Sequence, residues 1–161
     1  MSDKIYLDWN DVSDSISYIA AEIMDKNLDH DAVILAPYYG GWPVASLVVN
    51  RIRSINKNDS FKPSIITESD LTRHFLVPLL SHKHIIIFDD VLDTGKVING
   101  IIWRILHECE TFMTREQILN KITICTICKK RDADYPCLHI CDIHYGKKSP
   151  FIVFPWEKFN D

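Results

Sequence analysis

One stretch of this 161-residue chain decides how it folds: Ile85-Ile86-Ile87-Phe88-Asp89-Asp90-Val91-Leu92-Asp93-Thr94-Gly95-Lys96-Val97. Its four opening residues are apolar without alternation, which is typical of a central parallel strand covered on both faces. Two adjacent carboxylates follow, and Asp93-Thr94-Gly95 then opens a segment with helical spacing. A strand, a turn and a helix in this order predict an α/β protein with a parallel sheet.

The rest of the chain repeats this alternation of strand and helix. Apolar spacing predicts helices over 10–28, 43–52 and 98–106, and strands over 32–36, 64–67, 122–128, 138–143 and 151–154. We therefore expect an open, mostly parallel sheet flanked by helices in a single domain, 1–161. Ligands of such sheets bind outside the carboxyl ends of the strands, here after Ala36, Phe88 and Cys128.

Composition excludes several classes of protein. The 22 acidic and 18 basic residues give a net charge of −4, and the longest basic cluster is Lys129-Lys130-Arg131, so we expect no nucleic-acid partner. The first residues lack a signal-peptide pattern and the apolar runs are too short to cross a bilayer, so we expect no membrane association. Five cysteines, an odd number, favour a reduced cytoplasmic protein.

The turn after the central strand has the chemistry of a phosphate site. Gly95 lets backbone N–H groups approach an anion at the start of a helix, where the helix dipole favours negative charge. The carboxylates of Asp89 and Asp90 would repel that anion unless they accept bonds from sugar hydroxyls or share a cation such as Mg²⁺. These features predict a ligand with a phosphate and a cis-diol, a ribose 5-phosphate. The alternative is a strand end with solvated acids and Asp93 as a helix cap.

The same stretch resembles the phosphoribosyl pyrophosphate (PRPP) signature of type I phosphoribosyltransferases. That pattern is four apolar residues, two acids, two apolar residues and Asp-Thr-Gly-x-Thr. Further stretches are similar to the purine (xanthine/guanine/hypoxanthine) branch: Tyr6 and Trp9, the loop Gly40-Gly41-Trp42-Pro43-Val44-Ala45, and the ending Phe151-Ile152-Val153-Phe154-Pro155-Trp156-Glu157. The resemblance covers most of the chain and is weakest over 56–83. It implies a small hood, made from the two ends of the chain, beside the parallel sheet.

The resemblance implies a role for each matching residue. Asp89 and Asp90 would hold the ribose hydroxyls, directly or through Mg²⁺, and Asp93 would be the catalytic residue that helps to move a proton of the purine. The 5-phosphate would be wrapped by Thr94, Gly95, Lys96 and Val97. The pyrophosphate would lie against Tyr39, Gly40 and Gly41. The base would be bound by Lys129 at its 6-oxo group, by stacking on Phe151, and by the backbone of Ile152.

The implied activity is transfer of 5-phosphoribosyl from PRPP to a 6-oxopurine (xanthine, guanine or hypoxanthine) with release of pyrophosphate, as in purine salvage. The implied cofactor is Mg²⁺, and the implied partners are PRPP, the purine base and a second copy of the chain in a homodimer or higher homo-oligomer.

The sequence departs from the family pattern in three places. Tyr39 stands where relatives carry Arg or Lys, Val97 replaces the last Thr of the phosphate loop, and the segment 67–75 is short for a closing lid, with Arg73 as its one firm cation. These departures leave an alternative open: a PRPP- or nucleotide-binding regulatory or partner protein on the same fold, with weakened catalysis.

The cysteines suggest a further alternative, a zinc site. Cys125-x2-Cys128 and Cys137-x3-Cys141, with His139 and His144 nearby, have ligand-like spacing. However, Cys125 and Cys128 lie in a predicted strand, where residues three apart are expected to point to opposite faces. Buried cysteines that act as small hydrophobic residues are the more common case.

Overall fold

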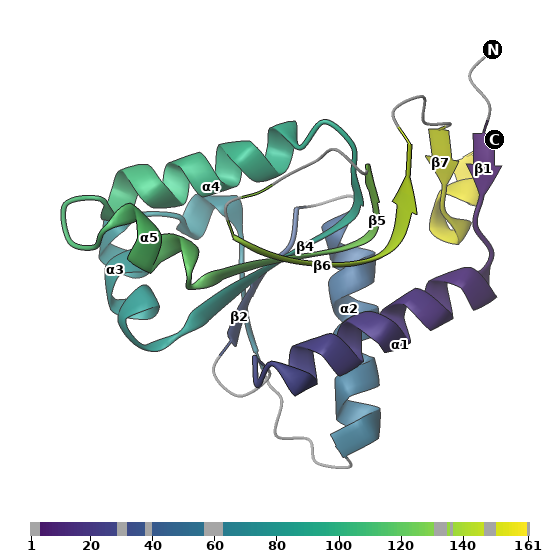
Figure 1. Cartoon of the computed structure of the whole chain (residues 1–161), viewed down its shortest axis with the longest axis horizontal. Coiled ribbons are helices and arrows are strands. Elements are labelled where there is room, and N and C mark those ends of the chain that lie inside the picture. Colours follow the sequence, from purple (N-terminus) through teal and green to yellow (C-terminus); the bar gives the residue numbers. More distant parts are fainter. Residues whose placement is uncertain are drawn as a thin grey trace.

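The centre of the protein is a five-stranded parallel sheet with the strand order β3-β2-β4-β5-β6 (Figure 1). The computed structural model describes residues 4–28, 32–37, 40–56, 63–130, 135, 137–146 and 151–160. The strands of this sheet are β2 (Ala32–Leu35), β3 (Ser64–Ile66), β4 (His84–Leu92), β5 (Ile122–Lys130) and β6 (Leu138–Tyr145). The predicted fold class, a parallel sheet flanked by helices, is confirmed.

Helices cover both faces of the sheet, as the uninterrupted apolar strands require. One face packs against α1 (Trp9–Asp25) and α2 (Gly41–Asn56), and its buried cluster includes Ile86 and Phe88 of β4. The other face packs against α3 (Arg73–His82), α4 (Lys96–Cys109) and α5 (Arg115–Leu119), with Ile85 and Ile87 of β4 in their cluster. The central strand therefore contributes alternate residues to two separate cores.

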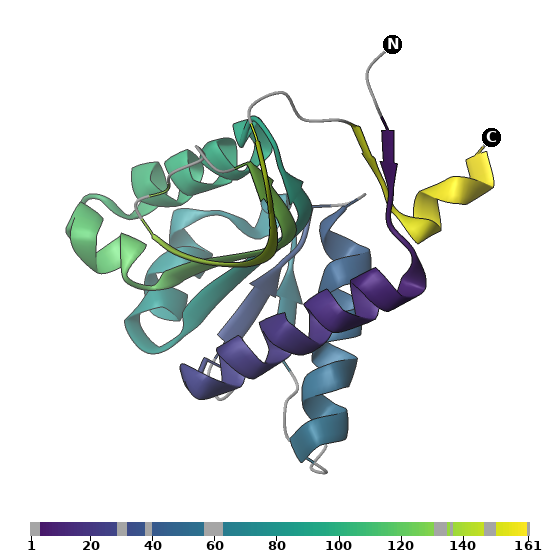
Figure 2. The same ribbon diagram turned by 45° about the vertical axis from the view of Figure 1, so that its right-hand side comes forward.

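The two ends of the chain form the predicted hood. The short strand β1 (Lys4–Tyr6) pairs in parallel with β7 (Phe151–Val153), and the 3-10 helix η2 (Pro155–Asn160) follows β7. From β1 the chain continues into α1, which runs from the hood across one face of the sheet (Figure 2). Asp8 caps α1 by accepting from the backbone N–H groups of Asn10 and Asp11.

The structure extends several predicted elements. β4 continues beyond Phe88 through both acids to Leu92, because Asp89 and Val91 pair with Thr126 and Cys128 of β5. Of the described helices, α3 and α5 were not predicted, nor was the 3-10 turn η1 (Glu68–Asp70). No helix among the described residues is long and apolar enough to cross a membrane.

The expectation that 67–75 serves as a lid with Arg73 as its cation is wrong for Arg73. The side-chain Nε of Arg73 donates to the backbone oxygen of Glu108 (3.3 Å), and its guanidinium lies 5.5 Å from the ring centre of Phe112. Glu108 lies near the end of α4, about 20 Å along the helix from its first residue, Lys96. Arg73 therefore fixes α3 against the far end of α4.

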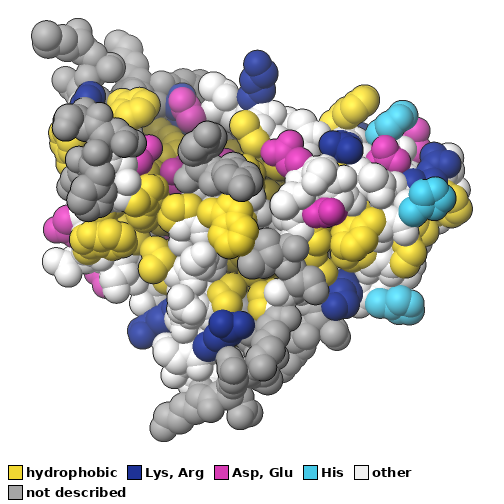
Figure 3. Space-filling model, turned by 180° about the vertical axis from the view of Figure 1, so that it is seen from behind, with side chains coloured by type: hydrophobic (Ala, Val, Ile, Leu, Met, Phe, Trp, Pro, Cys, Tyr) yellow, Lys and Arg dark blue, Asp and Glu magenta, His cyan; other side chains and the backbone are white. Residues whose placement is uncertain are grey.

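The face drawn in Figure 3 shows how the charged side chains are distributed. Lys and Arg side chains are scattered among acidic and hydrophobic ones, whereas histidines gather at the α3 end of the molecule. This end is remote from the carboxyl ends of the strands, where the predicted ligand site lies.

Candidate functional site

The loop before α2 lies directly against the two acids of β4. A Cβ atom added to Gly40 would lie 2.5 Å from Oδ1 of Asp90 and 2.7 Å from Oδ1 of Asp89. A Cβ on Gly41 would collide with the backbone oxygen of Phe88. Both positions therefore require glycine, and the predicted pyrophosphate loop and ribose site meet at one point.

Burial makes the two carboxylates of this site unusual. Burial, and secondly the charge of Asp90, raise the pKa of Asp89 from its ordinary 3.8 to about 7. The pKa of Asp90 is also raised, first by burial and then by the charge of Glu157 in η2. Two hydrogen bonds oppose these shifts: Asp89 Oδ1 accepts from the backbone N–H of Asp90 (3.1 Å), and Asp90 Oδ1 accepts from that of Val91 (2.7 Å). The site holds more negative charge than its own hydrogen bonds compensate.

The carboxylate oxygens of Asp89 and Asp90 are suitable ligands for a divalent cation. Mg²⁺ prefers carboxylate oxygens and is usually held by one or two of them, with water and ligand oxygens completing its coordination. No group of three or more His, Cys, Asp or Glu side chains is arranged to hold a metal in the described part of the chain. Asp89 and Asp90 are thus suited to a metal that arrives with its ligand, and not to a closed structural metal site.

The loop predicted to bind the 5-phosphate has a backbone suited to an anion. Gly95 is the N-cap of α4 and has a left-handed backbone with φ +67°, a conformation that favours glycine. The backbone N–H of Lys96 points to Thr94 Oγ1 at 3.4 Å. Thr94, Lys96 and Val97 are exposed, so the first turn of α4 is open to a ligand.

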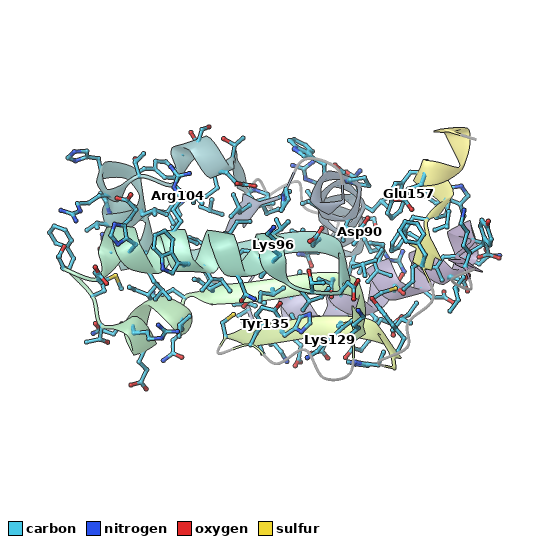
Figure 4. The ribbon with its side chains drawn as sticks, turned by 90° about the horizontal axis from the view of Figure 1, so that it is seen from above. Asp90, Lys96, Arg104, Lys129, Tyr135 and Glu157 are labelled. Atoms are coloured by element: carbon cyan, nitrogen blue, oxygen red, sulfur yellow. The ribbon has the colours of Figure 1, made fainter. Side chains whose placement is uncertain are left out.

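Asp93 is an exposed side chain and not the cap of α4, which rules out the alternative of a plain helix cap. Its carboxylate forms an ion pair with Lys130, the last residue of β5. The predicted base-binding Lys129 precedes Lys130 and lies opposite Leu92 in the pairing of β4 with β5. Figure 4 shows Asp90, Lys96 and Lys129 near the start of α4, with Arg104 further along that helix.

The predicted base-binding residues of the hood are separate from the central sheet. Phe151 and Ile152 lie on β7, where the Phe151 side chain is 59% exposed and Ile152 is buried against β1. The carboxylate of Glu157 in η2 lies near enough to raise the pKa of Asp90, so the hood and the acid pair are neighbours. Tyr39, predicted to contact pyrophosphate, lies outside the described residues.

The cysteines do not form the alternative zinc site among the described residues. Cys125 and Cys128 are both buried in the apolar core that packs against α1 and α2. Burial raises the pKa of Cys128 to about 12, so its thiol stays protonated. Cys141 donates instead to the backbone oxygens of Ile127 and Ile143, each at 3.4 Å. These cysteines act as packing residues.

Sequence reasoning missed three residues near the site. Lys130 pairs with Asp93, Glu157 acts on Asp90, and the hydroxyl of Tyr135 lies over Gly95. Lys130 and Glu157 stand within stretches that the sequence had singled out, so their neighbourhood was visible. Tyr135 stands in no recognised motif, and its contact with Gly95 joins residues 40 positions apart in the sequence.

Comparison with known proteins identifies the fold. Neither a protein-family model nor a curated protein matches the sequence. Among solved structures, a purine phosphoribosyltransferase from Pyrococcus horikoshii is similar over 99% of this chain and 97% of its own, with a TM-score of 0.65 and 21% identity.

Two further solved structures share the architecture. A hypothetical protein from Neisseria gonorrhoeae with bound ppGpp has a TM-score of 0.65 and 15% identity over 99% of this chain and 92% of its own. A hypoxanthine-guanine phosphoribosyltransferase from Schistosoma mansoni in complex with IMP has a TM-score of 0.52 and 14% identity over 83% of this chain and 62% of its own. The chain therefore has the fold of the type I phosphoribosyltransferases.

Proposed function

We propose that this protein is a purine phosphoribosyltransferase, which transfers 5-phosphoribosyl from PRPP to N9 of xanthine, guanine or hypoxanthine and releases pyrophosphate. One observation carries the proposal: Gly40 lies against the carboxylates of Asp89 and Asp90, one short turn from the left-handed Gly95. PRPP carries a pyrophosphate, a cis-diol and a 5-phosphate. A site for PRPP must therefore bring together a close-approach loop, an acid pair and an amide cradle.

The reaction breaks the bond between the anomeric carbon and pyrophosphate and forms a bond from that carbon to the purine nitrogen. Positive charge develops on the sugar and negative charge on the leaving group, so fixed donors and alignment supply most of the catalysis. Asp89 and Asp90 would hold Mg²⁺, which when bound would supply charge stabilisation for the departing pyrophosphate. The backbones of Gly40 and Gly41 leave the room that this group requires.

In this proposal the remaining residues position the base and accept its proton. Asp93 takes the proton of the purine imidazole, and Lys130 balances the Asp93 charge before the base arrives. Lys129 donates to the 6-oxo group, which favours a 6-oxopurine over adenine by about 1–3 kcal/mol because a buried unpaired donor is costly. Phe151, exposed on the hood, stacks on the base, and the backbone of Ile152 meets its edge.

A second candidate is a nucleotide-binding regulatory protein on the same fold. Two observations favour it: the residue before Gly40-Gly41 is Tyr39, which brings no charge to pyrophosphate, and a structural neighbour from Neisseria gonorrhoeae binds ppGpp. A Tyr39→Arg variant that gains turnover would identify the pyrophosphate loop as the weak point of an enzyme.

One experiment separates the two candidates. The purified protein is incubated with PRPP, Mg²⁺ and xanthine, guanine, hypoxanthine or adenine, and nucleotide is followed by chromatography. Binding of PRPP and of ppGpp is measured by calorimetry. Nucleotide from xanthine, guanine or hypoxanthine but not from adenine supports the transferase. PRPP or ppGpp binding without nucleotide from any base supports the regulatory protein. An Asp89→Asn/Asp90→Asn variant serves as the control that should bind PRPP poorly in either case.

A further inference from the structure

The side chain of Tyr135, a residue between β5 and β6, packs against Gly95 at the start of α4. A Cβ atom added to Gly95 would overlap the Tyr135 hydroxyl oxygen and lie 2.8 Å from Cζ of the same ring. The phenol oxygen therefore lies directly over the backbone of Gly95, and Gly95 is buried although its neighbours Thr94 and Lys96 are exposed. Figure 4 shows Tyr135 on the same side of α4 as Lys129.

The Tyr135 ring packs against a second aromatic ring. Its edge meets the ring of His139 on β6, with 6.2 Å between ring centres and planes at 70°. His139 is held in turn by a hydrogen bond between its Nε2 and Thr126 Oγ1 (3.0 Å). Burial, with the nearby charges of Lys129 and His144, lowers the pKa of His139 to about 4. His139 is therefore a neutral support for the Tyr135 ring, and its buried Nδ1 has no hydrogen-bond partner among the described residues.

The hydroxyl of Tyr135 is suited to donate a hydrogen bond. Burial, then the charges of Cys137 and Asp89, raise the pKa of Tyr135, so the phenol keeps its proton at neutral pH. A 5-phosphate needs several donors, and Val97 lacks the hydroxyl that the resembled signature has at that position. Tyr135 reaches the same loop from a different element of the fold.

We propose that Tyr135 is a binding residue for the 5-phosphate, in which its hydroxyl supplies a donor that the Val97 side chain lacks. The inference rests on the proposed function, because it assumes that the loop from Asp93 to Val97 receives the phosphate of a ribose 5-phosphate. It assigns to Tyr135 a specificity role, which favours a phosphorylated over an unphosphorylated ribose.

The test measures three ligands by calorimetry in the presence of Mg²⁺: ribose 5-phosphate, PRPP and inorganic pyrophosphate. Tyr135→Phe keeps the ring contact with His139 and removes only the hydroxyl. Loss of a hydrogen bond to a charged group should weaken the binding of ribose 5-phosphate and of PRPP by about ten-fold or more. Pyrophosphate, which in this proposal contacts the Gly40-Gly41 loop, should bind with unchanged affinity. Tyr18→Phe, on the exposed side of α1, is the matched control and should leave all three affinities unchanged.

A second variant tests whether the effect of Tyr135→Phe is purely structural. Adding Val97→Thr to Tyr135→Phe returns a hydroxyl to the loop from α4 itself and should recover part of the lost affinity for ribose 5-phosphate. A packing role for Tyr135 predicts no such recovery.

The outcomes separate this inference from the proposed function. Equal or tighter binding of ribose 5-phosphate by Tyr135→Phe overturns the role of Tyr135 and leaves the function standing; tighter binding would mean that the phenol blocks the loop. If the unaltered protein binds neither PRPP nor ribose 5-phosphate, the proposed function fails and the role of Tyr135 fails with it.

Discussion

Lys130 holds the carboxylate of Asp93 in an ion pair, so the last residue of β5 meets the loop that follows β4. Both side chains are partly exposed, at 27% for Lys130 and 52% for Asp93, and solvent therefore screens their attraction. Such a pair adds little stability and orients the carboxylate only weakly. In the proposed reaction Asp93 can therefore turn toward the imidazole side of the purine when the base binds.

Asp93→Asn should reduce nucleotide formation by about 100-fold, the usual size of a lost general base. The affinity for PRPP should change little, because the amide cradle and the acid pair remain. Steady-state kinetics and calorimetry on the same preparation measure both quantities. Unchanged turnover in this variant would remove Asp93 from the chemistry, whatever its pairing with Lys130.

Gly40→Ala should abolish tight PRPP binding, with an affinity at least about ten-fold weaker. The new Cβ would lie 2.5 Å from Oδ1 of Asp90 and must displace the carboxylate. Gly100→Ala is the matched control, because a Cβ there meets nothing within 4 Å on the exposed face of α4. That control should bind PRPP normally and gain about 0.5–1 kcal/mol of stability from helix propensity. Equal PRPP affinity in the two variants would separate Gly40 from the site.

The raised pKa of Asp89 predicts how stability depends on pH. The folded protein binds this proton with a pKa of about 7, against an ordinary 3.8, so the Asp89 contribution to stability is lost as pH rises from about 4 to about 7. The groups that bear on it are Asp90 and Tyr135, with Glu157 acting on Asp90. Asp89→Asn should therefore raise the melting temperature clearly at pH 8 and little at pH 4.5.

Thermal unfolding of Asp89→Asn at both pH values, without added metal, checks this expectation. Asp14→Asn, an exposed position on α1, provides the control and should change stability little at either pH. A gain for Asp89→Asn that is equal at pH 4.5 and pH 8 would show that the Asp89 carboxyl has an ordinary pKa.

The sequence predicted best where local pattern and tertiary environment agree. The run Ile85 to Phe88 is apolar on every residue, and the structure buries it between two helical layers. The glycines at 40 and 95 were informative because each has a backbone or contact requirement that only glycine meets. The hood was predictable from the motif at the end of the chain.

The rest depended on contacts between distant segments. α3 was missed because Pro78 lies inside it and interrupts the helical pattern, whereas burial of Leu76 and Leu80 against the sheet stabilises the helix. Tyr135, between β5 and β6, and Glu157, in η2, lie near the site although they are distant from it in the sequence. The spacing of residues in the sequence does not predict such contacts. The lid assigned to 67–75 was an inference from the resembled family, and such a resemblance does not say which surface this segment covers.

A variant of Arg73 tests whether this residue fixes α3 against α4 or belongs to a lid. Arg73→Ala removes the bond to the Glu108 backbone and the contact with Phe112, and should cost about 1 kcal/mol, or about 2–4 °C in melting temperature. PRPP affinity and turnover should stay unchanged, because this contact lies at the far end of α4 from Gly95. Arg115→Ala, exposed at the start of α5, is the control for loss of a positive charge. A ten-fold loss of PRPP affinity with an unchanged melting temperature would show that Arg73 belongs to a lid. A cation that closes over PRPP affects binding and not the packing of α3 on α4.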